Sequence, residues 1–231
     1  LLYLDTARFG PADARHMLVL IAGTHGVEGH CGSGAEIAWL KNGRPAKLPD
    51  NTGALLIHAI NPYGFAWSRR VTEDNVDLNR NFPTPNWARD AKVYWEDKTR
   101  KDPRRWPGPK PLSEPESKFF HEEMERFQPD LIVSIHAPYG VLDFDGPTVP
   151  PARLGRLYLD QVGIFPGSLG NYGGVHKGMP VVTIELPSAI RTPLDAEMRQ
   201  MWLDLLRWMS ERVMPAEGGA RAVPVKVKKS C

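Results

Sequence analysis

The sequence has little cysteine, no long apolar run and almost no excess of charge of either sign. Cys31 and Cys231 are too few to build a disulfide framework and favour a reducing compartment. Apolar runs such as "HMLVLIAG" are far shorter than the roughly 20 residues that cross a bilayer. Twenty-nine basic and 27 acidic residues leave a formal net charge of +2, unlike the basic surface of a general nucleic-acid binder. We therefore expect a globular protein that binds neither nucleic acid nor membrane.

The chain is long enough to bury one large core. With 231 residues, 42% of them hydrophobic, we expect a single domain over residues 1–231. The chain begins "LLYLDTARFG", without an initiating methionine, which suggests that an upstream segment has been removed. We expect a cytoplasmic protein, or a periplasmic one if that segment was a signal peptide. The sequence leaves open a monomer or a homodimer, and the tail 215–231 either adds an edge strand or frays.

Four short apolar runs predict strands that are covered on both faces: residues 17–22, 54–60, 131–136 and 181–186. Helical patterns cover residues 33–41, 114–127 and 193–213, and Ser113 with Glu116 predicts a capping box at the second helix. Alternating strands and helices predict a three-layer α/β/α sandwich with a mixed, mostly parallel sheet and a ligand site at the carboxyl ends of its strands. Residues 83–112 lack a sustained period and predict a long loop, either a functional lid or a solvated excursion.

Candidate metal ligands follow two of these strands. In "HGVE", His25 and Glu28 lie where a strand turns, so the chain can aim an imidazole and a carboxylate at one point. Zinc accepts this pair, and a catalytic site needs a third protein ligand and a position for water. His136, at the end of "LIVSIH", is the candidate third ligand. The alternative for His136 alone is an ordinary hydrogen-bonded histidine.

Glu185 places a carboxylate inside the apolar strand "VVTIELP". An unpaired charge there would cost several kcal/mol, so the residue needs a physical reason. One explanation is a structural salt bridge. The other is a general base aimed at a water molecule on the metal, which accounts for both the burial and the strand-end position.

The motifs together resemble the zinc carboxypeptidase family typified by carboxypeptidase A. "NVDLNRNF" (75–82) lies between the H-x-x-E strand end and the later S-x-H strand end. More narrowly, "NVDLNRNFPTPNW", "FPGSLGNYGG" and "PVVTIELP" resemble the bacterial murein peptide amidase branch, which cuts the bond between D-glutamate and the diamino acid of peptidoglycan peptides. The matches run in family order from about residue 22 to residue 188, and they imply a zinc carboxypeptidase-like fold.

The resemblance implies a role for each matching residue. His25, Glu28 and His136 match the ligands of one Zn²⁺ ion, and Glu185 matches the catalytic glutamate. Asp77 matches the aspartate that accepts a hydrogen bond from the first zinc histidine, although a turn-capping role is the simpler alternative.

Two further matches concern the substrate. Asn79 and Arg80 match the pair that grips the substrate carboxylate, for which a forked guanidinium is suited. Arg70 fits the arginine that stabilises the oxyanion, and Arg69 is the alternative. The loop tyrosine of carboxypeptidases has no counterpart in "DQVGIFPGS", and we read Tyr172 as a packing residue.

Other polar residues after His136 are left out of the predicted site. Tyr139, Asp143 and Asp145 stand where they would line a pocket for a charged diamino-acid side chain. Acidic residues in a loop are usually solvated, and that is the expectation here.

The resulting prediction is a zinc metallopeptidase, of metallocarboxypeptidase or γ-D-glutamyl-diamino acid amidase type. It would hydrolyse an amide bond in short peptides with a free carboxylate, derived from peptidoglycan. One alternative keeps the metal and makes the protein a deacylase of small N-acyl amino acids, similar to aspartoacylase. The other is an inactive peptide-binding module.

Overall fold

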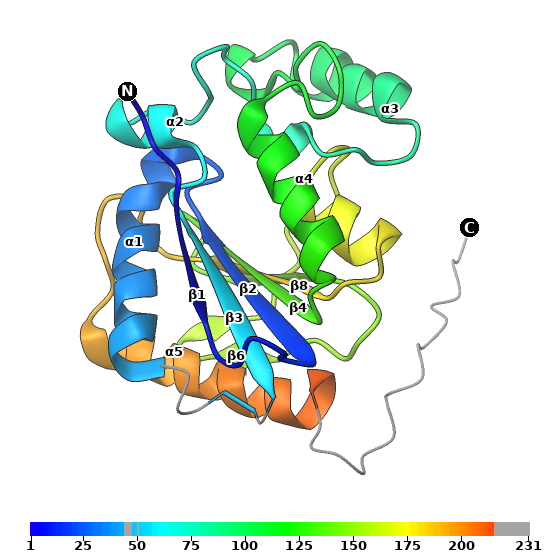
Figure 1. Ribbon diagram of the computed structural model, residues 1–231. Coiled ribbons are helices and arrows are strands. Elements are labelled where there is room, and N and C mark those ends of the chain that lie inside the picture. Colours follow the sequence, from blue (N-terminus) through cyan, green and yellow to red (C-terminus); the bar gives the residue numbers. More distant parts are fainter. Residues whose placement is uncertain (44–47, 50, 215–231) are drawn as a thin grey trace.

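A six-stranded mixed sheet forms the centre of the protein (Figure 1). The computed structural model describes residues 1–43, 48–49 and 51–214. The strand order is β1-β3-β2-β4-β8-β5, with β1 at Asp5–Phe9, β2 at His16–Ala22, β3 at Thr52–His58, β4 at Leu131–His136, β5 at Leu142–Asp145 and β8 at Val181–Glu185. The four inner strands are parallel to one another, and the edge strands β1 and β5 run antiparallel to their neighbours. The predicted mixed, mostly parallel sheet is confirmed.

Helices cover both faces of the sheet and complete the predicted three layers (Figure 1). Successive residues of β2 point to opposite faces, because side chains alternate along a strand. Leu18 and Leu20 join the apolar cluster on one face, and Val19 and Ile21 join the cluster on the other. The first face is covered by α1 (Gly29–Ala38) and α5 (Asp195–Trp208), and the second by α4 (Pro115–Phe127) and the helical turn Gly170–His176.

The remaining elements are short. They include α2 (Pro62–Ala66), α3 (Trp87–Val93), the hairpin of β6 (Arg153–Leu154) with β7 (Leu157–Tyr158), and several single helical turns. Among the described residues, no helix combines the length and apolar content needed to cross a bilayer.

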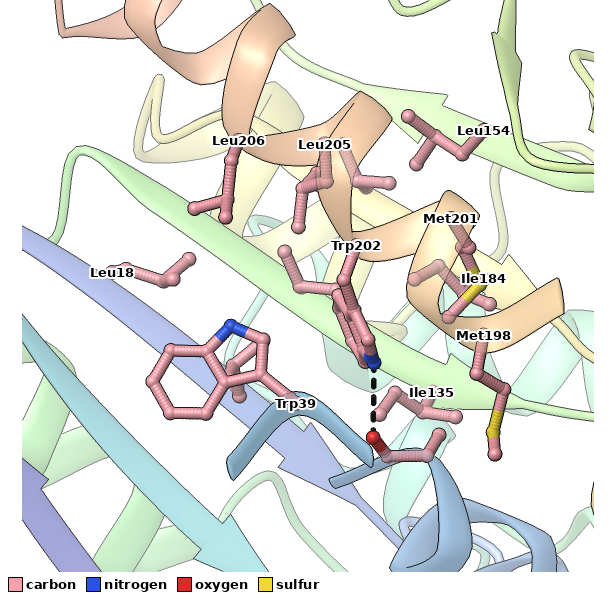
Figure 2. Packing of buried hydrophobic residues seen from close by; sticks show 14 of the residues in the cluster. Leu18, Trp39, Ile135, Leu154, Ile184, Met198, Met201, Trp202, Leu205 and Leu206 are labelled. Atoms are coloured by element: carbon pink, nitrogen blue, oxygen red, sulfur yellow. Dashed lines mark hydrogen bonds between the residues drawn. The ribbon is translucent and has the colours of Figure 1, made fainter. Parts of the chain in front are cut away.

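Two tryptophans pack in the layer formed by α1 and α5. Trp39, just after α1, and Trp202, on α5, are both fully buried (Figure 2). The indole of Trp202 also donates a hydrogen bond of 3.0 Å to the carbonyl oxygen of Ala35. Trp202 therefore ties α5 to α1 by packing and by a polar contact.

Replacing Trp202 by alanine is expected to lower the free energy of unfolding by about 3–5 kcal/mol, since it removes a large buried ring and leaves a cavity. Chemical denaturation would measure the change. The matched control is Trp67→Ala, because Trp67 is 67% exposed and its loss should cost less than about 0.5 kcal/mol. Equal losses in the two variants would contradict this account of the core.

The structure corrects the predicted start of the second helix. α4 begins at Pro115, Glu114 takes the N-cap position, and no side chain caps the helix. The hydroxyl of Ser113 instead donates to Glu114 Oε1 at 2.8 Å. Proline favours the first position of a helix, so Pro115 moves the start beyond the point at which Ser113 could cap it. The predicted capping box is wrong.

The segment 83–112 also differs from a plain loop. It contains α3, the helical turn Tyr94–Lys98 and the short helix Pro103–Arg105. Tryptophans hold parts of it in place: Trp87 Nε1 donates to the carbonyl of Arg80 at 2.7 Å, and Trp95 Nε1 donates to that of Asp102 at 2.8 Å. The sequence of this segment has no sustained helical period. Burial of the Trp87 side chain packs the segment against the rest of the domain. The predicted tail strand, 215–231, lies outside the described residues.

Candidate active site

The candidate residues gather at one edge of the sheet because three parallel strands end there. His136 and Glu185 are the last residues of β4 and β8, and they are register partners. Directly paired residues of neighbouring strands project from the same face of a sheet. His25 follows the end of β2 by three residues and is the N-cap residue of the short helix Gly26–Glu28. The ends of these three strands therefore bring His25, His136 and Glu185 close together, as the sequence predicted.

A backbone contact fixes the turn that carries His25 and Glu28. Gly26 N–H donates to Arg70 O at 3.2 Å, and Val27 N–H donates to Arg69 O at 2.9 Å. A Cβ atom at Gly26 would overlap the backbone of Gly64. Only glycine permits this approach, so the turn and the arginine-bearing segment are held together by main-chain atoms.

His25, Glu28 and His136 converge in a buried group whose ligand atoms all lie within 4.8 Å of one another. His25 Nδ1 is 3.0 Å from each carboxylate oxygen of Glu28. His136 Nδ1 is 3.0 Å from Glu28 Oε2 and 3.3 Å from His25 Nδ1. The three side chains are 3–6% exposed as residues. Lone pairs at these distances repel one another unless a proton or a cation lies between them.

The arrangement fits a divalent metal ion. Ligand atoms held tetrahedrally at roughly 2.0–2.2 Å from one zinc ion lie about 3.3–3.6 Å apart, and two histidines with one glutamate are a known catalytic zinc set. The nitrogen–nitrogen and nitrogen–oxygen separations here are close to that range. Burial raises the pKa of Glu28, but His25 and His136 outweigh it and hold the pKa well below its usual value.

Asp77 lies next to His25, on the side of the imidazole ring that faces away from Glu28. Its Oδ1 lies 3.3 Å from His25 Nε2, the ring nitrogen opposite the one that faces Glu28, although the angle is not that of a good hydrogen bond. Asp77 Oδ1 also accepts a hydrogen bond from Asn79 N–H at 3.0 Å, so the residue caps a turn as well. Burial would raise its pKa, but Arg70 and His25 hold the pKa well below the usual range. Such a carboxylate orients the histidine ring.

Arg70, rather than Arg69, reaches the buried group. Arg70 Nη2 donates to Asp77 Oδ2 at 2.9 Å, and Nη1 lies 3.8 Å from Glu28 Oε1. Nη1 makes no hydrogen bond to any residue in the described part of the chain. Arg69 turns outward and donates to Tyr63 and Asn75. The resemblance implied Arg70 for the oxyanion, with Arg69 as the alternative, and the geometry favours Arg70.

Glu185 lies next to the group without a salt bridge to any described residue. It is 7% exposed, and its Oε2 has no hydrogen-bond partner among those residues. Burial is the largest cause that raises its pKa; His136 opposes the shift and Glu28 adds to it. A divalent cation held nearby would lower the pKa again. The structural salt bridge considered from the sequence is therefore not formed within the described chain.

Asn79 and Arg80 do not lie equally close to the group. Asn79 lines a small cavity together with His136 and Glu185, and its Oδ1 accepts a hydrogen bond from Leu169 N–H at 2.9 Å. Arg80 does not line this cavity: its guanidinium carbon is 4.6 Å from the ring centroid of Phe165, which does. Burial lowers the pKa of Arg80. The role of Arg80 as a carboxylate-binding residue stays a prediction.

Two acidic residues set aside in the sequence analysis line the same cavity. Asp143 and Asp145 are 8% and 9% exposed and stand on β5, not in a solvated loop. The expectation that they are solvated is wrong, because β5 pairs with β8 beside Glu185. The alternation in "LDFD" is typical of a strand, but it places the aspartates on the polar face and so gives no signal of their burial.

Tyr172 has the packing role expected from the sequence. It is 1% exposed and stacks on Phe82 with ring centroids 5.8 Å apart. Its hydroxyl is 2.6 Å from His121 Nδ1. Cys31 is likewise a buried residue and not a ligand: its thiol donates to Glu28 O at 3.1 Å, and burial raises its pKa to about 12.

The sheet and the buried His–Glu–His group define a zinc carboxypeptidase-like protein. The crystal structure of the carboxypeptidase A from Helicoverpa armigera has the same fold. Its TM-score is 0.64 at 15% identity, with 87% of this chain and 63% of that chain covered. At this identity the likeness concerns the fold alone.

Sequence comparison is more specific. Murein peptide amidase A of Vibrio campbellii is 30% identical over 187 residues, covering 78% of this chain and 71% of the relative. The crystal structure of murein-tripeptide amidase MpaA from Escherichia coli O157 superposes with a TM-score of 0.63 at 28% identity, covering 87% and 86% of the two chains. Residues 1–110 match the family described as "Protein of unknown function (DUF2817)". The chain belongs to the zinc carboxypeptidase-like family that contains murein peptide amidase A.

Proposed function

We propose that this protein is a zinc-dependent amidase that hydrolyses one amide bond in a short, carboxylate-bearing peptide derived from peptidoglycan. The main support is the buried group of His25, Glu28 and His136, with Glu185 on the neighbouring strand. Membership of the family of murein peptide amidase A supports the substrate class. The three side chains would hold one zinc ion.

Each residue has a task that follows from its place. Zinc in this group would make a water molecule acidic enough to lose its proton near neutral pH and would polarise the substrate carbonyl. Glu185 accepts the proton of the attacking water and returns it to the leaving amine nitrogen. A zinc ion held beside Glu185 would keep its carboxylate ionised, so that it can accept the proton.

Arg70 stabilises the negative charge that develops on the carbonyl oxygen. Its Nε and Nη2 are committed to Asp77, which leaves Nη1 as the donor near Glu28. Because Asp77 fixes the guanidinium in advance, the donor needs little reorganisation during the reaction. Asn79 and Arg80 are assigned to the free carboxylate of the substrate.

Digestion of defined compounds tests this function. The zinc-loaded protein would be incubated with L-alanyl-γ-D-glutamyl-meso-diaminopimelate, and separately with N-acetyl and N-succinyl amino acids. We expect mass spectrometry to show free diaminopimelate and the alanyl-glutamyl dipeptide. Cleavage of the N-acyl amino acids alone would instead identify a deacylase. Binding of the tripeptide without cleavage of any compound would identify a peptide-binding module.

A further inference from the structure

A cavity of about 50 Å³ adjoins the proposed active site and contains two carboxylates that the mechanism does not use. Asn79, His136 and Glu185 line it together with Asp143 and Asp145. The two aspartates are separated by one residue on β5, so both side chains leave the same face of that strand. The cavity thus joins the proposed catalytic glutamate to an acidic pair.

The carboxylate of Asp145 is buried without a partner. Asp145 is 9% exposed, and it receives no hydrogen bond or ion pair from any residue in the described ranges. Side chains at Gly170 or Gly174 would overlap Asp145, so the backbone of that helical turn packs directly against it. The carboxylate is therefore held in place by packing, while its charge lacks compensation within the described chain.

Two neighbouring buried carboxylates are costly when both are ionised. Burial, together with Asp143, raises the pKa of Asp145 to about 7. Burial also raises the pKa of Asp143, which the backbone N–H of Phe144 opposes with a hydrogen bond of 2.9 Å to Asp143 Oδ1. A cation that enters with a ligand would remove this cost and gain charge-assisted hydrogen bonds.

The cation that fits is an ammonium group and not a second metal ion. Within the described chain, the side chains close enough to hold a metal are His25, Glu28 and His136; the aspartates do not form such a group. Two carboxylates in a cavity of this size suit the end of one unbranched side chain.

The position of the cavity indicates which substrate residue enters it. This step rests on the proposed function, in which Glu185 protonates the leaving nitrogen and Asn79 binds the free carboxylate. Both residues line the cavity. The released residue would have its amide nitrogen near Glu185 and its carboxylate near Asn79. Its side chain would therefore extend toward Asp143 and Asp145.

We propose that Asp143 and Asp145 form a cation-selecting subsite, which binds the side-chain ammonium group of the residue released from the scissile amide. The subsite makes the protein select leaving residues with an amino group at the end of the side chain. It discriminates against neutral side chains of the same length, and more strongly against acidic ones that lack an amino group.

Paired peptides test the subsite. L-alanyl-γ-D-glutamyl-L-lysine and its norleucine analogue differ in the ammonium group alone, and both would be assayed with the parent, Asp143→Asn, Asp145→Asn and the double variant. We expect kcat/KM of the parent to favour lysine by about 10- to 100-fold, as for a hydrogen bond to a charged group. The double variant should lose most of that preference while its rate with norleucine stays within a few-fold.

Asp195→Asn is the matched control, because Asp195 is exposed at the start of α5 and does not line the cavity. It should keep the preference for lysine. A second readout does not depend on hydrolysis: calorimetry on Glu185→Gln should show tighter binding of free lysine than of norleucine, and the added Asp143→Asn and Asp145→Asn changes should remove the difference.

The outcomes separate the two proposals. Cleavage of both peptides with a lysine preference that survives the double variant would overturn the subsite and leave the amidase function standing. Selective, aspartate-dependent binding of lysine without cleavage of any peptide would overturn the amidase function and keep the cation site. Equal binding of lysine and norleucine would overturn the subsite whatever the catalytic result. Because the substitutions remove buried charge, we expect melting temperatures no lower than that of the parent.

Discussion

Replacing Glu185 by glutamine is expected to reduce kcat by about 10²- to 10⁴-fold, the usual contribution of general acid–base catalysis. Glutamine keeps the size of the side chain but cannot accept and return the proton. Because Glu185 is not among the three proposed ligands, the variant should still bind one zinc ion. Steady-state assays with the tripeptide and metal analysis of the same sample would measure both quantities.

The control for this experiment is Glu211→Gln. Glu211 is exposed in the helical turn Met209–Val213, away from the cavity residues. It should leave both the rate and the zinc content unchanged. A Glu185→Gln protein that turns over the tripeptide as fast as the parent would show that another group handles the proton, even if zinc binds as expected.

Removing the metal is expected to abolish hydrolysis, and one equivalent of zinc should restore it. His136→Ala should behave like the chelated parent and should not regain activity, since His136 supplies one of three buried ligand atoms. Zinc should also stabilise the folded parent, by about 4 kcal/mol at a free concentration 1,000 times Kd. Activity after chelation and refilling, and the shift of the melting temperature with zinc, would be measured in parallel.

His176→Gln serves as the control for the histidine substitution. His176 is exposed at the end of the helical turn Gly170–His176 and is outside the buried group. It should keep the zinc-dependent rise in melting temperature, which His136→Ala should lose. Unchanged zinc affinity in His136→Ala would rule out the proposed ligand set.

The position of the buried group could be predicted because it depends on a local signal repeated along the chain. Each inner strand is a short apolar run, and each candidate residue stands at or just after the end of such a run. Parallel strands end at one edge of the sheet, so strand-end residues far apart in sequence must approach. The family-ordered motifs then assigned His25, Glu28, His136 and Glu185 their roles.

The edges of the sheet were harder to predict for a physical reason. β1 is an edge strand whose side chains are mostly exposed, so it lacks the apolar run that marks an inner strand. β5 is only four residues long and carries two aspartates, which favour a loop reading. In each case pairing with a neighbouring strand, rather than local composition, decides the structure.

The sequence by itself determined the parallel inner strands, the α/β class and the residues that stand at the strand ends, because periodicity and chain direction are local properties. Tertiary structure alone decided that Arg70 and not Arg69 faces Glu28, that Arg80 contacts the ring of Phe165 and does not line the cavity, and that Asp143 and Asp145 are buried beside Glu185. Those facts depend on which segments pack together. Burial and charge compensation arise from neighbours that are distant in the chain, and no pattern within one segment records them.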